Sequence, residues 1–105
     1  MAIKIEADAG IVRVTGEMTV YAAREFKQPL LDALAEGPAS IQLDLSGVSE
    51  FDTAGLQLLV LARRELLAKG RSLRLAATSE IVREALTLCG ALEPLVDAAP
   101  ARSRP

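Results

Sequence analysis

Hydrophobic and polar residues alternate near the start of the chain and mark two short strands. Ile3, Ile5 and Ala7 alternate with charged residues, which is typical of a strand with one buried face. The alternation resumes at Ile11 and predicts a second strand over residues 11–15. Only a short turn at residues 8–10 separates the two strands, so we expect them to pair as an antiparallel hairpin.

Apolar residues then recur at the spacing of an amphipathic helix. The first such segment predicts a helix over residues 20–35, with Thr19 as its N-cap. Pro29 falls inside this segment and should kink or restart the helix, because proline lacks a backbone N–H. The second segment predicts a strongly apolar helix over residues 54–69, and Gly70 occupies the stop position.

Two further strands and a third helix complete the pattern. Alternating apolar residues predict strands over residues 41–45 and 73–75. Ser79 is a predicted N-cap for a helix that ends at Gly90. Cys89 falls on the apolar stripe of this helix, so we expect it to be buried rather than reactive.

This order of elements predicts one α/β domain. Strand–helix–strand units imply parallel pairing with right-handed crossovers, and the hairpin adds an antiparallel edge. We expect a mixed, mostly parallel sheet of four to five strands with three to four helices. A short segment over residues 92–96 closes the domain, which we expect to span residues 1–97. Residues 98–105 are rich in Pro, Ala and Arg and are expected to form a flexible tail.

The composition argues against several functional classes. The chain has no histidine and one cysteine, which removes His-based catalysis, most zinc sites and any intrachain disulfide. Its 12 basic and 14 acidic residues are mixed, whereas nucleic-acid binding needs a dense basic patch. No apolar run approaches the roughly 20 residues of a membrane helix, and the start lacks a signal-peptide pattern. We therefore expect a cytoplasmic protein with no metal site, nucleic-acid partner or membrane insertion, and no residue pattern points to a cofactor.

The junction between the third strand and the second helix carries the most specific information. We predict a loop over residues 46–52, followed by Thr53 at the start of the apolar helix. Loops at the carboxyl ends of parallel strands often meet ligands, and a helix N-terminus attracts negative charge. A hydroxyl at this position can also be a simple N-cap that contributes about 1 kcal/mol. Gly55 costs a helix about 1 kcal/mol relative to alanine, which makes sense if another backbone or a partner approaches closely.

Residues 44–59, DLSGVSEFDTAGLQLL, resemble the signature of the STAS domain. This family is named after sulfate transporters and anti-sigma factor antagonists, and its hallmark is Asp-Ser/Thr-x-Gly-Leu at a strand-to-helix junction. Residues 16–19, GEMT, resemble a second family stretch at the exit of the hairpin. The resemblance covers about residues 3–97 and implies the STAS fold.

The resemblance also implies a function. In phosphorylatable members the hydroxyl residue after the aspartate accepts phosphate, which implies Thr53 as the phosphoacceptor. The kinase must be another protein, because the chain has no Gly-rich phosphate loop. The implied role is that of a protein that is not an enzyme: an anti-sigma factor antagonist-like switch whose partner is an anti-sigma factor or a serine/threonine kinase of GHKL type. A constitutive accessory subunit of a chemotaxis signalling complex or of a phospholipid-transport ABC complex is the alternative. The candidate partner-binding residues are Glu17, Thr19, Tyr21, Ser49, Glu50, Asp52, Ala54, Gly55 and Gln57.

Phosphate on Thr53 is expected to change binding more than folding. It adds about −1.5 to −2 charges at neutral pH. The helix N-terminus attracts this charge by typically 0.3–1 kcal/mol, while Asp52, Glu50 and Asp44 repel it by a similar amount each. A partner, in contrast, would have to strip water from a dianion. We therefore expect phosphorylation to release the partner without refolding the domain.

Overall fold

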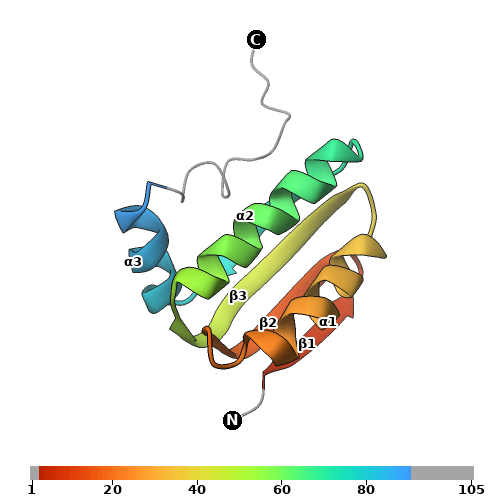
Figure 1. Cartoon of the computed structure of the whole chain (residues 1–105). Coiled ribbons are helices and arrows are strands. Elements are labelled where there is room, and N and C mark those ends of the chain that lie inside the picture. Colours follow the sequence, from red (N-terminus) through yellow and green to blue (C-terminus); the bar gives the residue numbers. More distant parts are fainter. Residues whose placement is uncertain (1–2, 91–105) are drawn as a thin grey trace.

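The computed structural model describes residues 3–90 and has the expected order of elements (Figure 1). The strands are β1 (Lys4–Asp8), β2 (Ile11–Met18), β3 (Ser40–Phe51) and β4 (Ser72–Thr78), and the helices are α1 (Ala23–Ala35), α2 (Thr53–Ala68) and α3 (Glu80–Leu88). The predicted closing segment over residues 92–96 and the predicted tail over residues 98–105 lie outside the described residues.

The four strands of residues 3–90 form one mixed sheet in the order β1-β2-β3-β4. β1 and β2 pair antiparallel, with Ile5 opposite Val14, and Ala9 and Gly10 form the turn between them in the left-handed region. β3 pairs parallel with both β2 and β4. The predicted α/β fold, with an antiparallel hairpin that opens a mostly parallel sheet, is confirmed.

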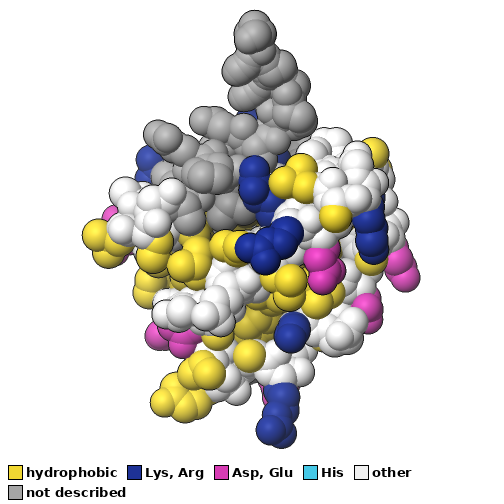
Figure 2. Space-filling model, turned by 45° about the horizontal axis from the view of Figure 1, so that its top comes forward, with side chains coloured by type: hydrophobic (Ala, Val, Ile, Leu, Met, Phe, Trp, Pro, Cys, Tyr) yellow, Lys and Arg dark blue, Asp and Glu magenta, His cyan; other side chains and the backbone are white. Residues whose placement is uncertain are grey.

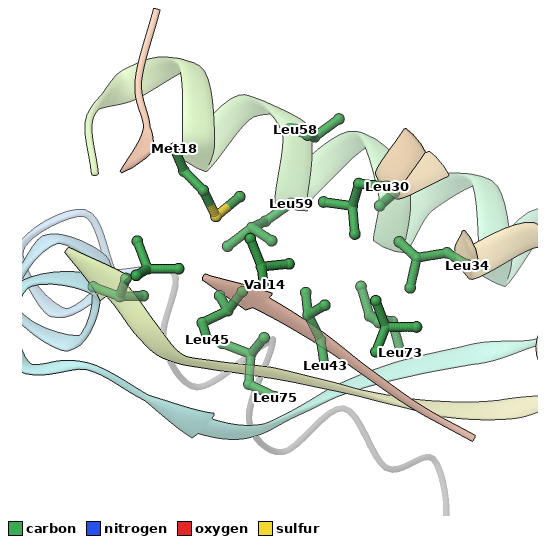
Figure 3. Packing of buried hydrophobic residues seen from close by; sticks show 14 of the residues in the cluster. Val14, Met18, Leu30, Leu34, Leu43, Leu45, Leu58, Leu59, Leu73 and Leu75 are labelled. Atoms are coloured by element: carbon green, nitrogen blue, oxygen red, sulfur yellow. The ribbon is translucent and has the colours of Figure 1, made fainter. Parts of the chain in front are cut away.

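The hydrophobic core lies between the sheet and the pair α1 and α2, which run side by side across one face (Figure 1). Leu43 and Leu45 of β3 are fully buried, and Leu59 of α2 is fully buried above them (Figure 3). Side chains at alternate positions point to the opposite face, where Arg13 and Gln42 are exposed. This one-sided burial explains the alternation that predicted the strands.

α3 lies beside the second half of β3, where β4 no longer pairs with that strand. β4 pairs with β3 only as far as Leu45, which lies opposite Thr78. The backbone N–H of Ser79 then donates to the Leu45 carbonyl at 3.1 Å, and α3 packs mainly against β3. Val82 and Leu86 of α3 are fully buried there.

Arg71, just before β4, closes the C-terminal end of α1. Its guanidinium donates to the carbonyls of Leu34 at 2.8 Å, Ala35 at 3.1 Å, Gly37 at 2.8 Å and Pro38 at 3.0 Å. The last carbonyls of a helix lack intrahelical partners, so a cation with several donors is well suited to this position. The contact ties the α2–β4 turn to the α1–β3 turn.

The start of α1 differs from the prediction. The helix begins at Ala23 with Ala22 as its N-cap, so the prediction that Thr19 caps it is wrong. β2 runs on to Met18 because β3 continues beside it, and residues 19–22 form a turn in which the Ala22 N–H donates to the Thr19 carbonyl at 3.0 Å. Pro29 lies on the exposed side of α1 and does not interrupt it.

The predicted loop over residues 46–52 is wrong, because β3 continues to Phe51. The register of β3 against β2 shifts twice, so buried and exposed positions do not alternate regularly in the second half of β3. Arg13 lies opposite Asp44, Thr15 opposite Gly47 and Glu17 opposite Glu50, so β3 gains one residue at each shift. As a result the buried positions after residue 45 are residues 48 and 51, at a spacing of three.

The end of α3 also corrects the sequence interpretation. α3 ends at Leu88, so Cys89 lies beyond the apolar stripe and is exposed, and the expectation that it is buried is wrong. Ser79 is the N-cap residue of α3, as predicted, but its side chain makes no capping hydrogen bond.

Candidate functional site

Asp52 organises the junction between β3 and α2. Its backbone is extended and it is the N-cap of α2, with Oδ1 accepting the Ala54 N–H at 2.8 Å. Oδ2 accepts the Val20 N–H at 3.0 Å, across 32 residues of sequence. The Asp52 N–H donates to the Met18 carbonyl at 3.2 Å. The carboxylate therefore joins the turn after β2 to the first turn of α2.

Thr53 is the first residue of α2 and its side chain is exposed. The unpaired N–H groups of a first helical turn give this end of the helix a partial positive charge. The Thr53 hydroxyl thus lies at a solvent-facing helix N-terminus, where another protein can reach it. This is the location that the sequence predicted for a phosphoacceptor.

Gly55 is buried, so the structure does not place it on a contact surface. A Cβ atom at this position would lie 2.6 Å from Cε1 of Phe51 and 2.8 Å from the carbonyl oxygen of Met18. Both distances are shorter than normal contacts between such atoms. Gly55 therefore allows the start of α2 to lie directly against the ends of β2 and β3, which sets the position of Asp52 and Thr53.

The turn over residues 19–22 exposes two large side chains beside this junction. Tyr21 is 93% exposed and Val20 is 61% exposed. Thr19, in contrast, turns its hydroxyl inward, where the oxygen is buried without a hydrogen-bond partner. The sequence analysis includes Tyr21 among the candidate partner-binding residues but not Val20, whose exposure follows from the turn that replaces the predicted start of the first helix.

A shallow groove of about 270 Å³ lies between the first halves of α1 and α2. Figure 2 shows hydrophobic side chains at the surface over these helices, with charged side chains of both signs around them. No lining residue is acidic, and two predicted residues, Ala54 and Gln57, take part. The lining residues are Ala23, Phe26, Lys27, Ala54, Gln57, Leu58 and Leu61.

Three predicted residues lie along β2 and β3 rather than over the helices. Glu17 is opposite Glu50 in the register, and it stands between buried Gly16 and Met18. Alternation along β2 therefore directs the Glu17 side chain to the face opposite α1 and α2. The Ser49 hydroxyl donates to the Gly16 carbonyl at 3.3 Å. The Glu17 side chain is therefore on the face of the sheet opposite the groove that Ala54 and Gln57 line.

Asp44 belongs to the first register shift of β3. Its Oδ1 accepts the Ser46 hydroxyl at 2.7 Å and the Ser46 N–H at 2.9 Å, and its Oδ2 lies 3.6 Å from Nε of Arg13. The two hydrogen bonds from Ser46, aided by the Arg13 charge, hold the pKa of Asp44 below its usual range. Asp44 therefore stabilises the shape of β3 through its charged form.

No helix of residues 3–90 is both long enough and apolar enough to cross a lipid bilayer.

Comparisons with known proteins agree on one family. The family described as "Mlab, STAS domain" matches residues 1–97. The anti-sigma-B factor antagonist of Staphylococcus epidermidis is 29% identical over 79 residues, which cover 75% of this chain and 73% of that protein.

Solved structures show the same fold. An anti-sigma factor antagonist from Mycobacterium paratuberculosis superposes with a TM-score of 0.72 at 26% identity, over 90% of this chain and 81% of that one. The anti-sigma factor antagonist SpoIIAA in its unphosphorylated form gives 0.69 at 22% identity, over 95% of both chains. The phosphorylated form of SpoIIAA, a Bacillus cell fate determinant, gives 0.64 at 22% identity, over 98% of this chain and 100% of that one.

Proposed function

Because this chain belongs to the STAS domain family, we propose that it is an anti-sigma factor antagonist-like protein-binding switch controlled by phosphorylation of Thr53. The observation that carries the proposal is the exposed Thr53 side chain at the first position of α2, directly after the capping Asp52. A kinase can reach this hydroxyl without unfolding the domain.

The relatives support the same class of function. The Staphylococcus epidermidis and Mycobacterium paratuberculosis proteins are both named as antagonists of anti-sigma factors. SpoIIAA, which shares the fold, exists in both a phosphorylated and an unphosphorylated form. The proposed partner is accordingly an anti-sigma factor, or a related serine/threonine kinase of GHKL type. The proposal assigns the chain no catalytic activity and places it in the cytoplasm, where transcription is regulated.

The proposed docking surface consists of the Thr53 end of α2, the exposed pair Val20 and Tyr21, and the groove between α1 and α2. Its apolar side chains supply area for a partner to bury, and Tyr is a residue type often found at the centre of interfaces. In the unmodified state Thr53 adds only a neutral hydroxyl to this surface. Phosphate would place a dianion there, and a partner would have to desolvate it. Binding therefore weakens while the buried core remains unchanged.

The experiment compares three versions of the full chain: wild type, Thr53→Val and Thr87→Val. Thr87 is the matched control, because it is also an exposed helical threonine but lies at the C-terminal end of α3. Each version is used to capture partners from native lysate, and the captured protein is identified by mass spectrometry and purified. The purified partner is then incubated with each version and ATP, and its affinity is measured by calorimetry.

We expect the partner to be an anti-sigma factor or its kinase. Phosphate should appear on wild type and on Thr87→Val but not on Thr53→Val, and phosphothreonine at position 53 should weaken binding at least tenfold. Equal modification of Thr53→Val would contradict the proposal. So would a transporter or chemosensory partner whose affinity is the same for the phosphorylated chain, since this result identifies a constitutive accessory subunit.

A further inference from the structure

We propose that Asp52 is a positioning residue that couples Thr53 to the turn carrying Val20 and Tyr21. In this arrangement the Asp52 carboxylate holds Val20 against the start of α2, and phosphate on Thr53 weakens that hold. The inference rests on the proposed function and adds a route by which modification of one side chain changes the neighbouring apolar surface. We call residues 19–21 the arm.

The two oxygens of the carboxylate have separate tasks. Oδ1 caps α2 through the Ala54 N–H at 2.8 Å, and Oδ2 accepts the Val20 N–H at 3.0 Å. Within residues 3–90 no other hydrogen bond joins the arm to α2. The Thr19 hydroxyl, which could have supplied a second link, is buried without a partner. Between its two buried flanking residues, the arm is therefore joined to the start of α2 by one hydrogen bond to a charged acceptor.

The ends of the arm are held firmly while its middle is not. Met18 is fully buried and Ala22 is 8% exposed, so both flanking residues belong to the core. Between them Val20 and Tyr21 project into solvent and make little contact with the rest of the domain. Loss of the Asp52 contact should free the arm and leave the surrounding fold intact.

A phosphate on Thr53 acts on this contact in two ways. Its charge of about −1.5 to −2 lies on the residue next to Asp52 and repels the carboxylate. Its oxygens also compete for the N–H groups of the first turn of α2, one of which now binds Asp52. Both effects favour movement of the carboxylate away from its present position. The Val20 N–H then loses its charged acceptor.

The variant Asp52→Asn separates the two tasks. Asparagine caps helices about as well as aspartate, so α2 keeps its N-cap. Ala54 and Val20 donate to different oxygens of Asp52, and asparagine has an NH₂ group in place of one of them, so an asparagine that caps α2 presents a donor to the Val20 N–H. The matched control is Asp44→Asn, since Asp44 also accepts a backbone N–H at 2.9 Å but lies in the register shift of β3, away from the arm.

Two measurements on the full chain report on the arm without any partner. Amide hydrogen exchange follows the Val20 N–H directly, and exchange at the buried residues Leu43 and Leu45 shows whether the domain stays folded. Fluorescence anisotropy follows Tyr21 selectively, because it is the only tyrosine and the chain has no tryptophan. Both are recorded for wild type, for each variant and for the chain with phosphothreonine at position 53.

We expect Asp52→Asn to speed exchange at Val20 about tenfold and to lower the Tyr21 anisotropy, because a hydrogen bond to a charged group is lost. Phosphothreonine at position 53 should shift both readings in the same direction, and Asp44→Asn should shift neither. Unchanged exchange at Val20 in the phosphorylated chain overturns the inference, as does an equal effect of Asp44→Asn.

Failure of this inference and failure of the proposed function give different results. If the phosphorylated chain releases its partner while Val20 stays protected, the coupling through Asp52 is wrong and the switch stands. If Val20 exchange accelerates while the partner stays bound, the coupling is supported and the switch is wrong.

Discussion

Replacement of Gly55 by alanine tests whether the close approach of α2 to the strand ends carries a measurable energy. The added Cβ would lie 2.6 Å from Cε1 of Phe51 and 2.8 Å from the Met18 carbonyl oxygen, where unstrained atoms stay about 3.5–4.0 Å apart. The Phe51 ring is only 9% exposed and has little room to move. The Met18 oxygen is fixed in the backbone and accepts the Asp52 N–H at 3.2 Å.

Two opposing contributions set the magnitude. Alanine is a better helix former than glycine by about 1 kcal/mol, which favours the variant. Overpacking of a tight contact costs about 1–3 kcal/mol, and the upper end applies because one of the two atoms belongs to the backbone. We therefore expect Gly55→Ala to lower the free energy of unfolding by about 2 kcal/mol. For a domain of this size that corresponds to a fall in Tm of roughly 8–16 °C.

Urea unfolding followed by far-UV circular dichroism measures this change. The pair Arg64→Gly and Arg64→Ala serves as the control, because Arg64 is exposed within the same helix and reports helix propensity alone. There the alanine variant should be more stable by about 1 kcal/mol. A Phe51→Leu change in the Gly55→Ala background should recover part of the loss, since it removes the ring contact but not the contact with Met18.

The reasoning is refuted if Gly55→Ala is as stable as wild type, or more stable, while the Arg64 pair shows the usual difference. That result would mean that α2 can move away from the strands at no cost. It would also remove the physical basis for the position of Asp52 and Thr53 described above.

Three further predictions test other parts of the structure. Arg71→Ala should lower the free energy of unfolding by about 1–3 kcal/mol in urea unfolding, because four carbonyls lose a charged donor, and lysine at this position should recover only part of the loss. Because the pKa of Asp44 is lowered in the folded state by Ser46 and Arg13, its contribution to stability is present above about pH 4 and is lost as the pH falls through the lowered pKa. Asp44→Asn should therefore be less stable than wild type at pH 7, and equal stability loss at pH 3 would contradict this. The exposed Cys89 thiol should react with Ellman's reagent in the native chain as completely as in urea, and protection in the native chain would contradict its placement.

Local signals in the sequence were sufficient for the order of elements and for the start of α2. Asp52 and Thr53 precede an apolar helix, and this short-range pattern is independent of the rest of the chain. The glycine at position 55 also predicted a close backbone approach, which the Met18 carbonyl provides. Short-range pattern was therefore enough to locate the N-terminus of α2 and to place Thr53 there, while the role of Thr53 stays a prediction.

The features that the sequence did not predict depend on pairing between residues far apart in the chain. The second half of β3 has no two-residue alternation, because its register against β2 shifts twice. The contact between Asp52 and Val20 joins residues 32 positions apart, and it exists only because β2 and β3 end side by side. The neighbours of Thr19 in the sequence predict a helix cap, because they do not show that β2 extends to Met18 through its pairing with β3.

The two register shifts mark where this protein can change in length. Each shift adds one residue to β3 relative to β2, and Phe51 nevertheless lies opposite Met18 on the buried face. Removal of one residue at a shift would leave a regular ladder there and keep Phe51 on that face. Removal of a residue from the regular ladder of residues 42–44 would instead turn side chains to the opposite face. The strand should therefore tolerate the loss of a single residue at a shift better than in its regular part.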